Sequence, residues 1–280
     1  MQSERLFKEA PVWQAIGALV GPSVLSVLVM IIYNMTDLFF IGLLQDTALT
    51  AAVAVVGPVF TLASAGATVL GMGGCAVVAG SLGAGDRQDA QCVSSLCGWC
   101  ALLTGVLLAV VLNLFCEPIL YLLGTNAEIL PYATHYLRIL ALGAPAMIFS
   151  VSAATLLRAD GAIRRGLVGN LAGSLTNILL DPLFILAFGW NIAGAAAATM
   201  LGNLVASGLY LHHILRRSDA LSLRPSDALR RPTRLGRVLT LGLPNGVSSL
   251  LSGLAGSFSN RLLAAYGTNA LAAMAAADKS

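Results

Sequence analysis

Residues 169–184 read GNLAGSLTNILLDPLF, an apolar stretch in which Asp181 is the one charged residue. Asn177, Ser174 and Asn170 precede this carboxylate at spacings of four, three and four residues. These spacings place the polar side chains on one face of an α-helix, and the rest of its surface is mainly Leu, Ile, Ala and Gly. Such a helix is typical of a membrane span whose polar face points into a bundle.

The composition of the whole chain supports the same environment. Of 280 residues, 57% are hydrophobic and only 10% are charged, with a mean hydropathy of +0.83. A soluble domain carries about 25% charged residues, so this chain has too few charges to cover a globular surface in water. Lipid is therefore the expected solvent, and the pI near 8.7 does not indicate a nucleic-acid partner.

Seven apolar segments are long enough to cross a bilayer, which takes about 20 helical residues. The fifth and sixth form one nearly charge-free run, which we divide at the turn residues Gly189, Asn191 and Gly194. The first is too long for a removable signal peptide and lacks a small-residue cleavage site. The predicted spans are 14–42, 51–80, 92–116, 136–157, 166–188, 192–215 and 238–262.

The basic residues are distributed unevenly between the loops. Most of the 16 Lys and Arg fall in residues 1–13, 81–91, 158–166 and 216–237, which share one side of the membrane if all seven segments cross it. The positive-inside rule then places the N-terminus in the cytoplasm. We expect the protein in the plasma membrane. We interpret the 216–237 stretch as an orientation signal and linker.

The chain also resembles itself. GPSVLSVL at 21–28 aligns with LPNGVSSL at 243–250, and at the same offset ALTA at 48–51 aligns with ALAA at 270–273. The offset spans six predicted helices, and because six is even, both copies have the same orientation in the membrane. A parallel repeat of this kind is a known plan of transporters.

These features predict an all-α polytopic membrane protein. It has a six-helix transmembrane lobe followed by the first helix of a parallel repeat, about seven transmembrane helices in this chain. The expected divisions are 1–215 for the N-terminal lobe, 216–237 for a basic cytoplasmic linker and 238–280 for the start of an incomplete second lobe. Because a complete second copy needs further helices, we expect the sequence to be a fragment.

A second intramembrane carboxylate lies in the first apolar segment. Residues 30–42 read MIIYNMTDLFFIG, and Asp37 is their only charged residue. A carboxylate at the centre of a bilayer costs about 2.5–3.5 kcal/mol, so such a residue usually faces the bundle interior and has a function. Tyr33 and Asn34 precede it by about one helical turn and are expected to face the same interior.

Polar residues on three predicted spans lie at a similar depth in the membrane. Thr199 and Asn203 in the sixth segment are four residues apart and share one helical face. Counting the helical rise from the adjoining loops places Asp37, Asp181 and Thr199 at similar depth in the outer half of the bilayer. Three polar positions on three different helices are therefore expected to converge.

The same region offers oxygen ligands for a cation. Pro182 has no N–H and frees the carbonyl oxygen of Ile178 beside Asp181. Carboxylate, amide and carbonyl oxygens are the ligands of hard cations such as Na+. Taken singly, the other polar residues fit hydrogen bonds between packed helices equally well. Together they are expected to line a cavity: Tyr33, Asn34, Asn170, Ser174 and Asn203.

Five stretches resemble the multidrug and toxic compound extrusion (MATE) family, in the order found in that family. They are YNMTDLFFIG, LGAGDRQDA, LLRADGAIRRGLVGNLAGSLTNILLDPLF, NIAGAAAATMLGN and LGLPNGVSSLLSG. The resemblance implies two six-helix lobes around a central cavity and export of amphipathic, often cationic small molecules in exchange for Na+ or H+. It implies no cofactor beyond the coupling ion, and it assigns a cation site to Asp37, Asn177, Asp181 and Thr199. Most of the second lobe of the family is absent from this sequence.

Motifs of soluble enzymes also occur in the chain, in unsuitable surroundings. CGWC at 97–100 lies inside an apolar segment, so its cysteines are interpreted as packing residues. GMGGCA at 71–76 fits the loose dinucleotide pattern but lacks the strand that this motif needs. No Ser or Cys has a plausible His partner, so no enzyme activity is expected.

Two alternatives to an exporter remain at this level. A flippase of lipid-linked sugars is favoured less, because the apolar spans hold almost no Arg or Lys to bind pyrophosphate, Arg261 being the main exception. A seven-helix receptor is favoured less still, because the predicted orientation is reversed and the repeat predicts more helices. The sequence leaves open the exported compound, the choice of Na+ or H+, and the oligomeric state.

Overall fold

The computed structural model describes residues 47–265, together with positions 24, 28–29, 31–33, 35–36, 39–40 and 42–43. Within these residues the regular structure is entirely helical, as the composition predicts. The first apolar segment lies largely outside them, as do the repeat stretches at 21–28 and 270–273. The internal repeat therefore stays a prediction.

Six helices of the described part are long and apolar enough to cross a membrane, and they match predicted segments two to seven. They are α3 Thr47–Gly83, α4 Arg87–Leu114, α6 Leu130–Ala159, α7 Ile163–Pro182, α8 Asn191–Arg216 and α10 Arg234–Ala265. Several helices run past the predicted apolar limits. α8, for example, ends with Arg216, where a cation interacts favourably with the C-terminal end of the helix dipole.

Two short helices lie where the sequence predicts loops. α5 Cys116–Leu122 follows α4, and α9 Pro225–Arg230 lies between α8 and α10. α6 begins at Leu130 and not near residue 136, with Pro131 in its first turn, where the missing N–H costs no helical hydrogen bond.

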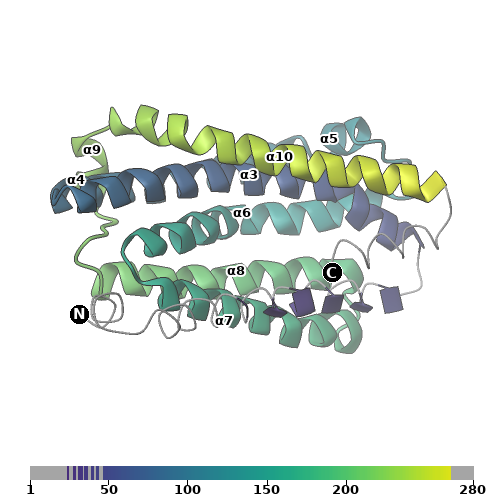
Figure 1. The fold of residues 1–280 in the computed structure, drawn as a ribbon. Helices are drawn as coiled ribbons and strands as arrows, with labels where there is room; N and C mark the ends of the chain where they lie inside the picture. The colour runs from purple at the N-terminus through teal and green to yellow at the C-terminus, as the bar shows by residue number, and fades with distance from the viewer. Residues whose placement is uncertain are drawn as a thin grey trace.

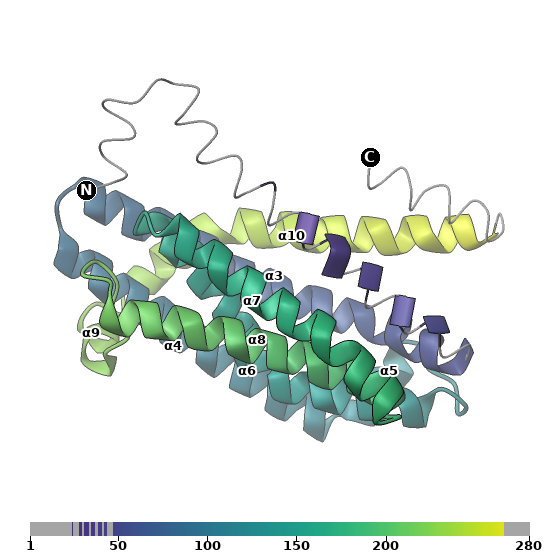
Figure 2. The same cartoon turned by 90° about the horizontal axis from the view of Figure 1, so that it is seen from below.

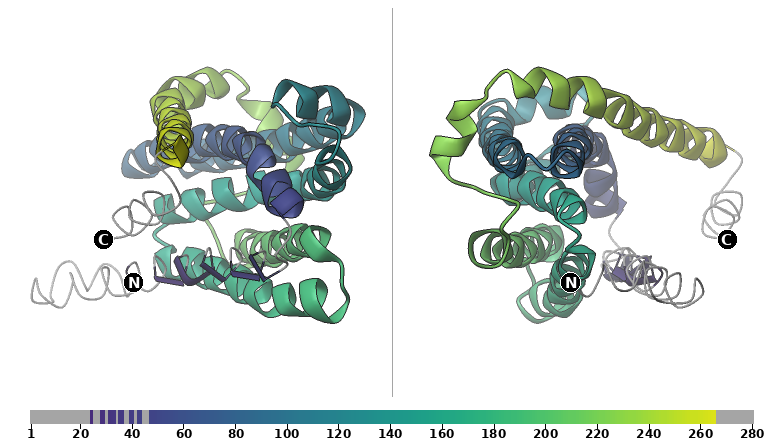
Figure 3. Two further views of the ribbon diagram at one scale, coloured as in Figure 1. Left: turned by 90° about the vertical axis from the view of Figure 1, so that its right-hand side faces the viewer. Right: turned by 60° about the vertical axis from the view of Figure 1, so that its left-hand side comes forward.

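The long helices form three layers, and α6 is the middle one (Figure 1). α3, α4 and α10 lie on one side of α6, and α7 with α8 lies on the other, as the end-on views in Figure 3 also show. α6 contacts α3, α4, α7 and α8. In the most apolar stretch of α6, 61% of the residues are buried, against 22% in that of α7 and 17% in that of α10. α6 is therefore the central helix, and α7 and α10 present apolar surface outward.

Glycines bring α3 and α10 into backbone contact along much of their length (Figure 2). A Cβ atom at Gly73 would overlap the backbone of Val238, and one at Gly242 would overlap the backbone of Val69. Close approach through small residues is a common way to pack helices in membranes, where apolar burial supplies little driving force between them.

α7 is interrupted at Pro182, inside the predicted span 166–188, and the turn before α8 lies where the sequence predicts it. α7 ends at Pro182 and continues as one π-helical turn, Leu183–Ala187, because proline cannot donate the helical hydrogen bond. The chain then reverses at Gly189 and Asn191, which have φ angles of 68° and 51°. Both values lie in the left-handed region, which Gly and Asn tolerate best.

The connecting segment (residues 217–233) is docked against α4 and is more than a spacer. Gln91, Ser94, Ser95 and Trp99 project from one face of α4, and each donates a hydrogen bond to a backbone carbonyl of the segment, at 2.7–3.3 Å. Ser222 N also donates to Ser94 Oγ at 2.9 Å. The polar face of α4 thus binds the segment through its backbone.

An ion-pair cluster fixes the end of the connecting segment. The side chain of Asp89 on α4 is only 3% exposed. It accepts hydrogen bonds from Ser81 Oγ at 2.7 Å, Arg231 Nη1 at 2.7 Å and Arg234 Nε at 3.0 Å. The bond to Asp89 raises the pKa of the Arg231 guanidinium above its usual value. One buried carboxylate therefore ties α3, α4 and the start of α10 together.

Candidate functional site

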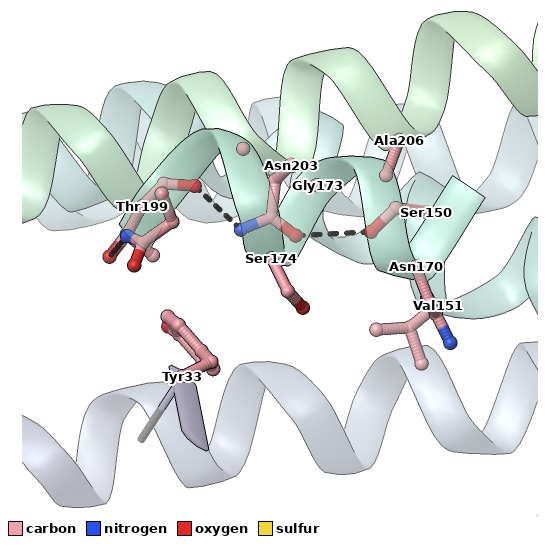
Figure 4. Close-up of a pocket in the computed structure, with 11 residues that line it drawn as sticks. Tyr33, Ser150, Val151, Asn170, Gly173, Ser174, Thr199, Asn203 and Ala206 are labelled. Carbon is pink, nitrogen blue, oxygen red and sulfur yellow. Dashed lines mark hydrogen bonds between the residues drawn. The ribbon is translucent and has the colours of Figure 1, made fainter. Parts of the chain in front are cut away.

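A cavity of about 150 Å³ opens between α6, α7 and α8, with Tyr33 across from them (Figure 4). The structure gathers here six of the residues that the sequence singled out: Tyr33, Asn170, Ser174, Asn177, Thr199 and Asn203. Ser150 and Val151 of α6 complete the wall and were not predicted. The lining contains no Lys, Arg or His among the described residues.

Backbone contact between α7 and α8 places these polar side chains next to one another. A Cβ atom at Gly173 would lie 2.8 Å from Gly202 O, and one at Gly202 would lie 2.7 Å from Gly173 O. No larger residue fits at either position without moving a helix. The two helices are therefore close enough for their side chains to bond across the gap.

Hydrogen bonds join the cavity wall across three helices. Asn177 Nδ2 on α7 donates to Thr199 Oγ1 on α8 at 3.2 Å, and Asn203 Nδ2 donates to Thr199 O at 2.9 Å. Ser150 Oγ on α6 lies 3.2 Å from Asn203 Oδ1 and 2.9 Å from Met147 O, so it shares one proton between the two acceptors. These bonds fix the orientation of the amides of Asn177 and Asn203.

Asp181 lies one turn beyond Asn177, on the same face of α7. Asp181 is 0% exposed and Asn177 is 2% exposed. Asn177 Oδ1 is buried and has no hydrogen-bond partner among the described residues. A buried acceptor without a partner costs about 1–3 kcal/mol, so this oxygen is suited to a ligand.

The donor set at this position fits a hard monovalent cation. It consists of a carboxylate, an amide oxygen and a hydroxyl, which are oxygen ligands only. The described residues contain no group of three or more His, Cys, Asp or Glu that could hold a transition metal. Asp37 and Asn34 lie outside the described residues, so their convergence with Asp181 stays a prediction.

Two polar features that the prediction omits, Ser150 and the polar face of α4, are visible in the sequence. Ser150 interrupts an apolar helix just as Ser174 does, which could have marked it as facing the interior. Gln91, Ser94 and Ser95 have the helical spacing of the polar face on α7, next to the CGWC motif. Within that motif Cys97 is 0% exposed, and all five cysteines of the chain are free, as packing residues would be.

A family model and the sequences of known proteins both relate this chain to multidrug exporters. The MatE family model matches residues 22–183. The multidrug export protein MepA of Staphylococcus aureus (strain NCTC 8325 / PS 47) is 30% identical over 274 residues, which are 97% of this chain and 61% of MepA. MepA of Staphylococcus saprophyticus is 31% identical over 276 residues. The chain thus spans about three fifths of the length of these relatives, which are named as export proteins.

Solved structures of MATE transporters also superpose on this chain. A crystal structure of MATE in the straight conformation superposes with a TM-score of 0.87 at 28% identity, covering 99% of this chain and 62% of the other. The outward-facing conformation of a multidrug resistance MATE family transporter gives a TM-score of 0.83 at 28% identity, covering 95% of this chain and 59% of that one.

Proposed function

The chain belongs to the MatE family, and on that premise we propose that it supplies the first lobe and the start of the second lobe of a secondary active efflux transporter. The transporter exports amphipathic, cationic small molecules in exchange for Na+ or H+. The observation that carries the proposal is the polar cavity between α6, α7 and α8, where Asn177 is bonded to Thr199. The buried Asp181 is not part of the cavity lining but lies one helical turn from Asn177 on α7.

The buried carboxylate is the proposed coupling group. A charge at this depth costs several kcal/mol unless it is neutralised. A proton on Asp181, or a Na+ ion held by Asp181, Asn177 Oδ1 and Thr199 Oγ1, would remove that cost. We propose Asp37 as the second carboxylate of the site. Because two nearby carboxylates resist double ionisation, binding of the coupling ion would bias the lobe between two conformations.

The cavity wall supports a cationic rather than an anionic substrate. Its described polar groups are amides and hydroxyls, which present oxygen acceptors, and it holds no basic side chain. A flippase for lipid-linked sugars must neutralise pyrophosphate, and nothing in the described lining would do so. Membership of a family whose relatives are named as exporters likewise gives the receptor hypothesis no support.

The ends of the helices support a proposal for the orientation in the membrane. α4, α7 and α10 begin, and α6 and α8 finish, at one end of the bundle (Figure 1). Arg87, Arg158, Arg164, Arg216 and Arg234 lie at these helix ends. We propose that this end faces the cytoplasm, with the N-terminus on the same side of the bacterial cell membrane.

The test is ion-dependent binding of an amphipathic cation. Tetraphenylphosphonium would be titrated into the purified chain in lipid nanodiscs, at several pH values with and without Na+. Wild type is expected to show an affinity that changes with one of the two ions, and Asp181→Asn is expected to bind with no ion dependence. An unchanged ion dependence in Asp181→Asn would contradict the coupling role, and an absence of binding by wild type would contradict the function.

A further inference from the structure

Tyr210 of α8 lies behind the cavity wall and is almost completely buried, with 1% of its surface exposed. Its ring packs against Gly169 of α7, where a Cβ atom would overlap the ring carbons. The ring therefore has one position, and its hydroxyl points to a fixed place on α7. Tyr210 is not itself among the residues that line the cavity.

The hydroxyl of Tyr210 has two neighbours on α7. In the structure it lies 2.9 Å from Gly166 O and 2.8 Å from Asn170 Oδ1, two acceptors. A phenol has one proton to donate, and a backbone carbonyl can only accept. If the proton goes to Gly166 O, the second contact is a hydrogen bond only when the amide of Asn170 is turned so that its NH₂ faces the phenol oxygen.

The oxygen and the nitrogen of a terminal amide have nearly the same shape, so hydrogen bonding decides which is which. With the oxygen of Asn170 toward Tyr210, two oxygens would share one proton, as at Ser150, and each hydrogen bond would be weaker than a full one. With the nitrogen toward Tyr210, both contacts are hydrogen bonds. Figure 4 draws the amide with its nitrogen at the free end, and the bonding of Tyr210 reverses that assignment.

The consequence reaches the cavity, because Asn170 is exposed and lines it. Once its NH₂ is bonded to Tyr210, its carbonyl oxygen is the atom presented to a ligand. Asn177 Oδ1, also on the lining, has no partner among the described residues. Of these two amide oxygens of α7, that of Asn177 is buried, so the oxygen of Asn170 is the acceptor that the cavity exposes.

We propose that Tyr210 is a positioning residue for substrate specificity: it turns the oxygen of Asn170 into the cavity, and the cavity therefore selects cations that carry N–H donors. Protonated primary and secondary amines fit this wall, whereas quaternary ammonium ions offer it no hydrogen. The inference rests on the proposed function and adds to it the class of cation that the site prefers.

The experiment uses two probes that share one aromatic body. One carries a primary ammonium group and the other a trimethylammonium group. Their Kd values would be measured on the full 280-residue chain in lipid nanodiscs, for wild type, Tyr210→Phe, Asn170→Leu and the double variant. Tyr210→Phe keeps the ring against Gly169 and removes only the hydroxyl, which leaves the amide of Asn170 free to rotate.

Wild type is expected to bind the primary ammonium probe about fivefold to tenfold more tightly than the quaternary one, since a hydrogen bond contributes about 1 kcal/mol. Tyr210→Phe should lose most of that preference, with the Kd of the quaternary probe unchanged. Asn170→Leu should lose it too, and the double variant should lose no more, because both substitutions remove the same interaction.

Three results would overturn the inference. In the first, wild type binds both probes equally, and in the second, Tyr210→Phe keeps the preference. In the third, Tyr210→Phe weakens both probes by the same factor, which would show that the hydroxyl only holds α7 to α8. If wild type bound neither cation, the proposed function would fall together with this inference.

Discussion

At the cavity, uncharged side chains of α7 and α8 leave one buried oxygen, Asn177 Oδ1, without a hydrogen-bond partner among the described residues. At the connecting segment, Asp89 accepts hydrogen bonds from three side chains, and the facing helix surface bonds the backbone of the segment repeatedly. One region is polar but incompletely bonded, and the other is charged and fully bonded.

The difference indicates different tasks. A complete network of buried hydrogen bonds holds its elements in one arrangement, because every group that moves loses a partner. An incomplete one costs stability and can recover it when a ligand supplies the missing contact. The connecting segment is therefore suited to keep the start of α10 on the first lobe, and the cavity is suited to bind a ligand.

The ion-pair cluster should be the more costly region to damage. Asp89→Asn would leave Arg231 and Arg234 without their shared carboxylate, and breaking a buried pair costs about 3–5 kcal/mol. Since the two arginine side chains are 40% and 31% exposed, we expect about 2–3 kcal/mol, nearer to the value of a partly solvated pair. Unfolding of the purified protein in detergent, followed by thermal shift, would measure it.

Asp86→Asn is the matched control for this substitution. Asp86 contacts the same Arg231 at 3.4 Å, but its side chain is 45% exposed. Exposed pairs contribute about 0–1 kcal/mol, so the control should unfold close to wild type. Equal destabilisation by the two variants would mean that burial of Asp89 is not the reason for its effect.

Removing one hydrogen bond of the docked segment should cost less. Ser94→Ala deletes the acceptor of Ser222 N and a hydroxyl that shares its one proton between Gln91 O at 3.1 Å and Ser222 O at 3.3 Å, and Ser94 is 2% exposed. Loss of the partner of a partly buried N–H costs about 1–2 kcal/mol, which is the loss expected in the same unfolding measurement. Asn113→Ala is the control on this helix, because its side chain bonds to Ala109 O of α4 itself. A variant Ser94→Ala as stable as the control would contradict the docking argument.

The sequence predicts the cavity side of this comparison better than the connecting segment. The face formed by Asn170, Ser174, Asn177 and Asp181 follows from spacing within one helix, and the break near Gly189 follows from local turn chemistry. The docking of Ser94 on Ser222 joins residues 128 apart, and helical periodicity carries no information on a partner so distant. The bond between Asn177 and Thr199 depends on their shared depth, which the sequence predicts, and on the close contact of Gly173 with Gly202, which it does not.

Substitution in the cavity should change cation affinity more than stability. Asn177→Leu removes one hydrogen bond to Thr199 and also removes the buried oxygen that has no partner among the described residues. The first loss is about 1 kcal/mol and the second is a gain of similar size, so stability should change by less than about 1 kcal/mol. Cation affinity should fall by more than about tenfold, because a ligand oxygen is lost. Strong destabilisation with cation affinity retained would show that Asn177 is structural.

The smallest effect is expected from pH, at the turn between α6 and α7. Burial raises the pKa of Asp160 above its usual value, a shift reduced by the hydrogen bond from Ser218 Oγ at 2.8 Å and by His213. A carboxyl group whose folded pKa is raised binds its proton more tightly in the folded state. Its contribution to stability is therefore fully present below the pKa of the unfolded chain, about 4, and is lost as the pH rises through the folded value.

The unfolding free energy of wild type should thus decline slightly over that range relative to Asp160→Asn, which carries no titrating group but can still accept the bond from Ser218. Taking the difference between the two proteins at each pH cancels the titration of groups that they share. A difference that grows in favour of wild type as the pH rises would mean that the bond from Ser218 and the nearby His213 outweigh burial, and that the Asp160 carboxylate is stabilised in the fold.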